Sequence, residues 1–236
     1  MMDFNVDVGE GFDNENAILP FVSSCNIACA SHAGNELIMR SVINLAKKYE
    51  IRIGAHPAFE DRMNFGRLVL DTTLPVLKNS IRSQIKLLID IAKDEGAVVE
   101  YIKPHGALYH KVCNDPDYAE LMTVLIAEDF KGLSLMGLPN CIASNLCREK
   151  GIEYLSEGFA DRTYEVDGNL RLRNLEGSVL INDEAVLNQV IEIKNSKVTT
   201  YNGEKISLVV NSICFHGDHE GSAERIKFVV NRINEL

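Results

Sequence analysis

The 236-residue sequence predicts an α/β fold in which parallel strands alternate with helices and close into a TIM-like (β/α) barrel. Three observations predict it. Apolar segments of strand length recur, helical segments with one apolar face follow them, and ionisable residues gather just past the strands. A parallel strand that is buried on both faces is continuously apolar, so polar residues beyond its carboxyl end indicate a site at one mouth of the barrel.

Seven segments have the length and apolar character of strands. They are residues 2–8, 24–30, 51–55, 98–103, 133–137, 152–156 and 206–215. Because no internal repeat, low-complexity tract or linker interrupts them, one (β/α)-barrel domain is expected over residues 1–236.

Helix and turn signals support this order. The clearest helix is expected over residues 73–95, where apolar residues recur at steps of three and four and Gly96 supplies a stop. Asn35 is suited to cap a helix that runs to Tyr49, and the last helix is expected to open at residue 218 or 219. Asn202–Gly203 predicts a hairpin turn between Val198 and Ile206.

Composition narrows the class of protein. The net charge is −10 and no Lys/Arg-rich stretch occurs, which argues against nucleic acid or an anionic membrane as the main partner. No signal-peptide pattern opens the sequence and no apolar run approaches about eighteen residues, so a cytoplasmic protein is expected. The six cysteines are scattered through apolar segments and are expected to be reduced, buried thiols.

Ionisable residues follow six of the seven predicted strands. In chain order they are Asp7 and Glu10, His32, His56, Lys103 and His105, Glu157 with Asp161 and Arg162, and His216 with Asp218. A single histidine or aspartate at a strand end is more often a capping or hydrogen-bonding group than a catalyst. Repetition after six strands favours one shared pocket, because the carboxyl ends of barrel strands converge.

Six sequence blocks resemble those of a known family. They are DFNVDVGEGF, SSCNIACASHAG, IGAHPAFEDRMNFGR, KPHGALYH, EGFADRTY and SICFHGD, in this order from residue 3 to about residue 218. Together they resemble the LamB/YcsF family. The resemblance implies a seven-stranded barrel related to the glycoside hydrolase and polysaccharide deacetylase superfamily. It also implies the family's best-known activity, ATP-dependent opening of 5-oxoproline to glutamate with separate subunits B and C.

The chemistry of that reaction suggests roles for the catalytic candidates. A five-membered lactam is a resonance-stabilised amide, so the enzyme needs a base for water and an acid for the ring nitrogen. Asp7 is the expected base, and His56 or His105 is the expected acid because imidazole exchanges protons near neutral pH. Glu10 is the fourth catalytic candidate, directly after the same strand as Asp7.

The remaining candidates are expected to bind substrate: His32, Lys103, Glu157, Asp161, Arg162, His216 and Asp218. Lys103 and Arg162 could hold a carboxylate or a phosphate. An equally weighted interpretation pairs them with Glu157 and Asp161 in a structural network.

Nucleotide handling is expected to depend on partner subunits. The sequence contains no GxxxxGK[ST] loop, and its short glycine motifs do not form a phosphate cradle on a strand–helix turn. ATP is therefore expected as a co-substrate that is bound and handled together with the partner subunits.

Two blocks depart from the family pattern. The second usually reads ACGFHAGD, whereas Ala30, Ser31 and Asn35 replace the glycine, the aromatic residue and the acid around His32. The last usually has Pro-Gly soon after HGD, whereas His219 and Glu220 precede Gly221 here. Loss of an aromatic residue beside His32 is expected to change one pocket wall, which places the substrate in question.

Two other functions remain open. Deacetylases of the superfamily hold a divalent metal with one aspartate and two histidines, and Asp7, His32 and His56 could converge similarly, although the compact His-x-x-x-His pair is missing. A metal-dependent amidohydrolase acting on another lactam, amide or N-acetyl group would follow. A non-catalytic metabolite-binding or scaffold protein is the third hypothesis, which so many clustered ionisable groups disfavour.

Overall fold

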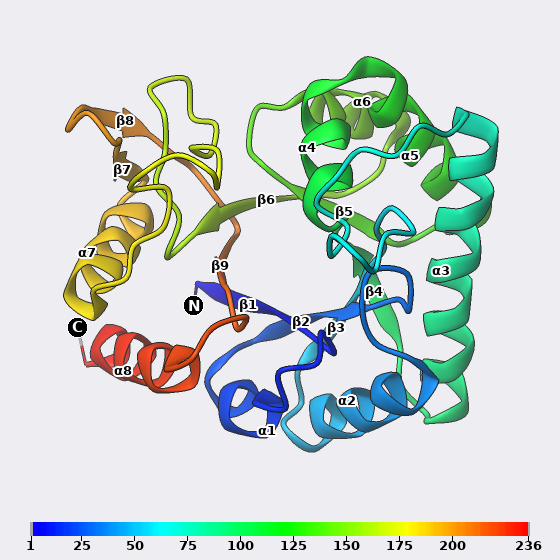
Figure 1. The fold of residues 1–236 in the computed structure, drawn as a ribbon, viewed down its shortest axis with the longest axis horizontal. Coiled ribbons are helices and arrows are strands. Elements are labelled where there is room, and N and C mark those ends of the chain that lie inside the picture. Colours follow the sequence, from blue (N-terminus) through cyan, green and yellow to red (C-terminus); the bar gives the residue numbers. More distant parts are fainter. Residues whose placement is uncertain (1, 236) are drawn as a thin grey trace.

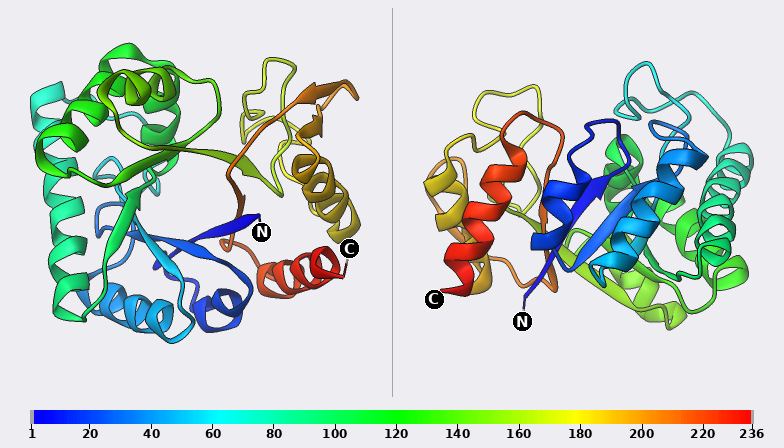
Figure 2. Two further views of the ribbon diagram at one scale, coloured as in Figure 1. Left: turned by 180° about the vertical axis from the view of Figure 1, so that it is seen from behind. Right: turned by 90° about the horizontal axis from the view of Figure 1, so that it is seen from below.

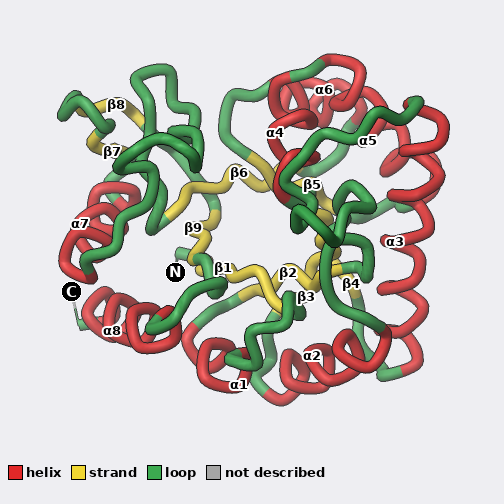
Figure 3. Tube along the Cα trace, viewed as in Figure 1, coloured by secondary structure: helices red, strands yellow, loops and turns green. Residues whose placement is uncertain are grey.

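The computed structural model describes residues 2–235 and contains the predicted closed barrel of seven parallel strands. The strands follow the order β1-β2-β3-β4-β5-β6-β9 and form the central ring in Figure 3. Their bounds are β1 Asp3–Val8, β2 Ser24–Ala28, β3 Arg52–His56, β4 Val99–Ile102, β5 Ser134–Gly137, β6 Tyr154–Phe159 and β9 Ser212–Phe215. The strand prediction is confirmed, because each barrel strand overlaps one predicted segment.

Helices surround this ring, as Figures 1 and 2 show. They are α1 Glu15–Ile18, the 3-10 turn η1 Leu19–Phe21, α2 Glu36–Lys48, α3 Leu74–Asp94, α4 Gly106–Asn114, α5 Pro116–Asp129, α6 Ile142–Lys150, α7 Asp183–Lys194 and α8 Ser222–Asn234. Their apolar faces and the outer faces of the strands form one continuous hydrophobic core. Among the described residues, no helix is both long and apolar enough to cross a membrane.

The two predicted helices over residues 35–49 and 73–95 are confirmed. The Asn35 side chain accepts a hydrogen bond from the backbone N–H of Ile38 and so caps α2. Helix α3 follows Thr73 and has Pro75 in its first turn, where a missing N–H costs nothing. Both helices bury one face against the barrel, as their periodicity predicted.

The barrel interior is polar along β1. Asn5 Nδ2 donates to Ser212 Oγ of β9 at 2.8 Å, and Asn26 Nδ2 of β2 donates to Asn5 Oδ1 at 2.8 Å. One rung below, the Asp3 carboxylate accepts hydrogen bonds from Ser24 and Ser212. These side chains satisfy one another's hydrogen-bonding groups inside the barrel. The same network includes Asp7 at the mouth, because Asn26 also donates to Asp7.

The predicted strand 206–215 is wrong in its first half. Lys205–Ser207 is β8, which pairs antiparallel with β7, Lys197–Thr199, outside the barrel and beside α7 (Figure 1). This pairing confirms the predicted hairpin. The chain then turns into the barrel at Asn211, whose backbone N–H and side-chain oxygen bond to Ser156 and remove the preceding segment from the barrel ladder.

Two other boundaries also differ from the prediction. Strand β6 runs to Phe159, so Glu157 lies within the strand, paired in register with Ser212, and points into the barrel with no exposed surface. Helix α8 begins at Ser222 and not at residue 218 or 219, because Gly221 adopts a left-handed φ of 78° just before it. All six cysteines are buried free thiols, as predicted.

Candidate active site

Asp7 is the last inward-facing residue of β1 and lies at the base of the site. Its Oδ1 accepts hydrogen bonds from Asn26 Nδ2 at 2.7 Å and from Lys103 Nζ at 2.9 Å, while Oδ2 lies 3.4 Å from His56 Nε2. Burial alone would raise the pKa of Asp7, but the neighbouring His56 and Lys103 hold it well below its usual range. Asp7 is therefore an ionised carboxylate.

Lys103 follows β4 and is 2% exposed. Its Nζ forms ion pairs with Asp7 at 2.9 Å and with Glu157 Oε1 at 2.8 Å. Burial would lower the pKa of Lys103, yet the negative charges around it, led by Asp7, raise it well above its ordinary value. A buried cation after β4 is thus compensated by carboxylates of β1 and β6, the two strands that flank β9.

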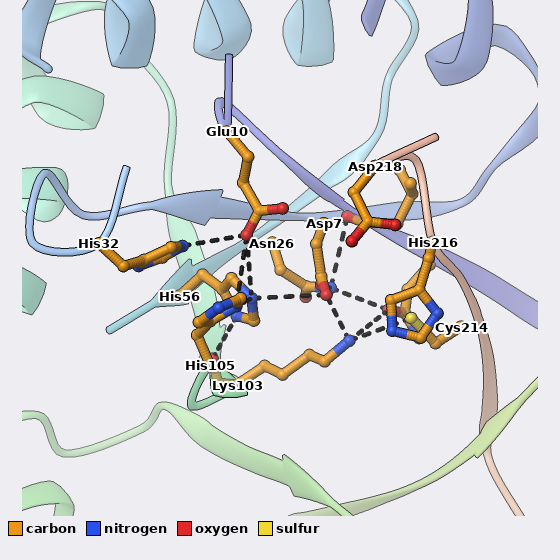
Figure 4. Close-up of polar contacts among 12 residues, drawn as sticks. Asp7, Glu10, Asn26, His32, His56, Lys103, His105, Cys214, His216 and Asp218 are labelled. Atoms are coloured by element: carbon orange, nitrogen blue, oxygen red, sulfur yellow. Dashed lines mark hydrogen bonds and ion pairs between the residues drawn. The ribbon is translucent and has the colours of Figure 1, made fainter. Parts of the chain in front are cut away.

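Glu10 projects toward three histidines, as Figure 4 shows. Its Oε1 lies 3.0 Å from His32 Nε2, 3.3 Å from His105 Nδ1 and 3.8 Å from His56 Nε2. Burial and the nearby charges of Asp7 and Asp218 raise the pKa of Glu10 well above its usual range. The two carboxylates at the end of β1, Asp7 within the strand and Glu10 just after it, therefore sit in opposite environments.

The three histidines share a compact pocket behind Glu10. His32 stacks on His105 with ring centroids 3.9 Å apart, whereas the His56 ring is almost perpendicular to that of His105. Burial lowers the pKa of His32 to about 3, and burial together with His56 lowers the pKa of His105. His32 and His105 are consequently neutral imidazoles.

A cavity of about 450 Å³ opens above these groups at the barrel mouth. Its wall includes the cations Arg67, Arg162 and Arg173, and the first and third of these form ion pairs with Asp218. Arg162 is buried and donates to the carbonyl oxygens of Ser178 and Arg171. Burial and Arg173 lower the pKa of Arg162 to about 10, so an anion in the cavity would be favourable there.

A second histidine–carboxylate pair borders the same cavity. His216 Nδ1 lies 2.7 Å from Asp161 Oδ1, and the His216 backbone N–H donates to Asp161 Oδ2 at 3.0 Å. Burial would raise the pKa of Asp161, but His216 outweighs it and lowers that pKa. The carboxylate fixes the imidazole, which leaves Nε2 as the nitrogen available for proton exchange.

The structure brings all eleven predicted residues to this end of the barrel, in two groups. Eight line the cavity: Asp7, Glu10, His56, Lys103, His105, Arg162, His216 and Asp218. The other three, His32, Glu157 and Asp161, are buried beneath or behind the first group and contact its members.

The predicted structural network is half correct. Lys103 does pair with Glu157, but among residues 2–235 no carboxylate forms an ion pair with Arg162. The reason is that Asp161 turns toward His216, leaving Arg162 to bond backbone carbonyls.

Sequence reasoning missed Asn26, Arg67 and Arg173. Asn26 had a detectable signal, since it is a polar residue in the middle of a buried strand. Arg67 and Arg173 lie in the two segments that interrupt the strand–helix alternation, 57–67 and 159–178, and only the fold shows that both face the cavity.

The altered second block lies away from the cavity wall. Ala30 and Ser31 line a separate surface hollow with Arg62, and Asn35 serves as the cap of α2. The aromatic contact of His32 comes instead from Phe65, whose ring lies edge-on at 5.3 Å. The expected change in the pocket wall is therefore wrong for the main cavity, because Ala30 and Ser31 line the separate hollow and not this cavity.

Four side chains could hold a metal ion. The candidate ligand atoms of Glu10, His32, His56 and His105 all lie within 4.8 Å of one another. Asp7 does not belong to this group, and its Oδ1 accepts hydrogen bonds from Lys103 and Asn26. The predicted set of Asp7, His32 and His56 is thus replaced by one centred on Glu10.

Comparison with known proteins agrees with the architecture and with the motifs. The profile of the LamB/YcsF family matches residues 2–236. This chain belongs to the LamB/YcsF family. Relatives in the family include the 5-oxoprolinase A subunit of Haemophilus influenzae, 35% identical over 235 residues, which are 99% of this chain and 96% of that one. The corresponding 5-oxoprolinase protein of Bacillus cereus is 37% identical over 230 residues, covering 94% and 91% of the two chains.

A solved structure of similar sequence has the same fold. The lactam utilization protein of Thermus thermophilus superposes with a TM-score of 0.91 at 28% identity, covering 99% of this chain and 97% of the other.

Proposed function

We propose that this chain is the lactam-opening component of an ATP-dependent 5-oxoprolinase, which converts 5-oxo-L-proline to L-glutamate with subunits B and C. The observation that carries the proposal is the ionised Asp7, held by Lys103 and Asn26 at the base of a cavity lined with cations. A base facing an anion-binding cavity suits hydrolysis of a small acidic amide. The names of the relatives supply the substrate.

Coupling to ATP provides the activation that an unstrained lactam needs. ATP phosphorylates the ring carbonyl oxygen in a step that depends on the partner subunits. Water then adds to that carbon and loses a proton to Asp7, the C–N bond breaks, and the ring nitrogen takes up a proton. Hydrolysis of the remaining acyl phosphate by a second water gives glutamate and phosphate.

We assign the acid role to His216 in preference to His56 or His105. His216 borders the cavity and is oriented by Asp161 through a 2.7 Å contact. One nitrogen of His56 and one of His105 already bond to backbone carbonyls, and their other nitrogens face each other. His216 thus has a ring nitrogen directed to proton exchange with a leaving amine.

The arginines account for recognition of the anionic substrate. Arg162 and Arg173 line one side of the cavity, and neither the Ser178 nor the Arg171 carbonyl neutralises the charge of Arg162. A planar guanidinium can bind the substrate carboxylate, or the phosphoryl group after transfer. The bound lactam would then present its carbonyl carbon toward Asp7.

The test is glutamate formation from 5-oxoproline and ATP by this chain mixed with subunits B and C. We expect no glutamate without this chain, and an Asp7→Asn loss of about 10²–10⁴-fold in kcat. Exposed Lys86→Met is the control, since its partner Asp90 lies on the surface of α3. Full turnover by Asp7→Asn would exclude Asp7 from the chemistry. Turnover without this chain would show that the chain does not catalyse the reaction.

A metal-dependent amidohydrolase acting on another lactam or amide is the second candidate. The observation favouring it is the cluster of Glu10 with three histidines. Turnover of a lactam by this chain alone, without ATP, would favour this candidate over the first.

A further inference from the structure

Two imidazoles in the histidine cluster have fixed tautomers. His56 Nδ1 lies 2.7 Å from the Lys103 carbonyl oxygen, and His105 Nε2 lies 2.9 Å from that of Phe65. A carbonyl oxygen only accepts, so each of these nitrogens carries the proton. In the neutral form of each ring, the lone pair is therefore on His56 Nε2 and on His105 Nδ1.

These two lone-pair nitrogens face each other at 3.0 Å. Two acceptors at this distance repel unless a cation or an additional proton lies between them. Backbone carbonyls that hold the outer nitrogens are also the usual support of metal-binding histidines. The arrangement is therefore that of a ligand pair prepared by the surrounding backbone.

Glu10 supplies a third candidate ligand atom beside the two histidine nitrogens. Its Oε1 lies 3.3 Å from His105 Nδ1 and 3.8 Å from His56 Nε2. Metal–ligand bonds near 2.1 Å place neighbouring ligand atoms about 3.0–3.5 Å apart. The observed separations of 3.0, 3.3 and 3.8 Å approach that range.

We propose that Glu10 Oε1, His56 Nε2 and His105 Nδ1 bind one divalent transition-metal cation. Two imidazole nitrogens with one carboxylate favour zinc, manganese, iron, cobalt or nickel over magnesium and calcium, which prefer oxygen ligands. All three residues line the cavity, so a bound cation would be accessible to water or to a substrate oxygen. It would supply a Lewis acid there.

His32 is a positioning residue in this arrangement. Its ring is parallel to that of His105 within 6° and the two centroids are 3.9 Å apart, so a cation in the plane of the His105 ring lies outside the plane of the His32 ring. Its Nε2 lies 3.0 Å from Glu10 Oε1 and can donate to it. Removing His32 should weaken cation binding without abolishing it.

Gly66 keeps the two stacked rings in place. Its φ of 63° is left-handed, and a Cβ there would lie 3.0 Å from His32 Cβ and 3.1 Å from His105 Cδ2. The loop 57–67 thus packs directly against the ligand histidines and presents the Phe65 carbonyl to His105. Fold elements outside the cavity specify the site, which is unlike a chance grouping of surface histidines.

The test measures cation binding by the whole chain without substrate, ATP or partners, so its result is independent of 5-oxoprolinase activity. Chelator-treated protein is titrated with Co²⁺, whose visible absorption reports nitrogen and oxygen ligation, and the bound metal is quantified by elemental analysis. We expect one Co²⁺ per chain, displaced by Zn²⁺. His219→Gln is the control, because His219 lies outside the cluster and its Nε2 is near Arg225.

The variants separate ligands from neighbours. His105→Ala and Glu10→Gln should each abolish the absorption, and Glu10→Gln retains the shape of the side chain if the alanine variant does not fold. His32→Gln should retain the absorption but bind about 10–100-fold more weakly. Absence of stoichiometric Co²⁺ in the folded wild type would leave a proton alone between His56 and His105 and would overturn the proposal. Co²⁺ binding by Glu10→Gln that matches the wild type would overturn it too, because Glu10 would then not be a ligand.

Discussion

Replacement of Lys103 by methionine tests the ion network on which the site is built. The substitution keeps the length and apolar stem of the side chain but removes a cation that is 2.9 Å from Asp7 and 2.8 Å from Glu157. Both carboxylates are then left buried without their cation. Removing one partner of a buried pair costs about 3–5 kcal/mol.

This loss is large enough to measure easily. For a chain of this size about 1 kcal/mol corresponds to a Tm shift of about 2–4 °C, so Lys103→Met should lower Tm by about 6–20 °C. Urea unfolding followed by circular dichroism gives the free energy. Lys86→Met on the surface of α3 is the matched control, with an expected change of about 0.5 kcal/mol or less.

A second variant, Glu157→Gln, isolates the contribution of the Lys103–Glu157 ion pair. Glu157→Gln alone leaves Lys103 paired with Asp7, whereas the double variant Lys103→Met/Glu157→Gln removes both members of the Lys103–Glu157 pair. We expect the double variant to be more stable than the sum of the two single losses by about 0.5–3 kcal/mol. Additive losses, or a Lys103→Met change as small as that of Lys86→Met, would refute the network as a source of stability.

Three other predictions concern the cavity and its support. Asp161→Asn should lower kcat about 10–100-fold in the assembled enzyme because His216 loses its orienting carboxylate. It should also reduce acid sensitivity: the depressed pKa of Asp161 stabilises the fold above its unfolded value near 3.9, and that contribution is lost as pH falls through the folded pKa. Urea unfolding at several pH values checks this. The same loss of unfolding free energy at acidic pH in Asp161→Asn as in the wild type would contradict it. Arg162→Met should raise KM for 5-oxoproline about 10–100-fold with a smaller effect on kcat, because a charge-assisted contact contributes about 1.5–3 kcal/mol; an unchanged KM would exclude Arg162 from binding. Gly66→Ala should cost about 1–3 kcal/mol in urea unfolding, since it strains a left-handed φ and presses on His32, and wild-type stability would show that the loop relaxes freely.

The barrel was predictable because two local signals agreed along the whole chain. Apolar strands and helical periodicity recur regularly, and each strand leads to polar residues. The end of β6 was not predictable from the sequence. A glutamate after an apolar segment indicates the end of a strand, and only the structure shows that Lys103 pairs with Glu157 and so allows it to lie buried within β6. The start of β9 was missed because Asn211 turns the chain through contacts with Ser156, which is 55 residues away.

The membership of the site was easier to predict than its internal arrangement. Strand ends identify which residues meet, since parallel strands bring their carboxyl ends to one mouth. Orientation depends on distant backbone: the carbonyl of Phe65 fixes His105, and that of Lys103 fixes His56. No spacing in the sequence encodes these contacts, so the assignment of acid, base and ligand required the fold.

The end of β1 shows how one short segment produces two different carboxylates. Asp7 is the last inward residue of the strand and meets Lys103, whereas Gly9, with a φ of 73°, turns the chain so that Glu10 faces the histidines. The nearby cations hold the pKa of Asp7 low, while burial and the charge of Asp7 itself raise that of Glu10. A carboxylate already neutralised by lysine has little further affinity for a cation, and one surrounded by neutral imidazoles gains most from it. Within three residues the chain therefore separates the proposed base from the proposed ligand.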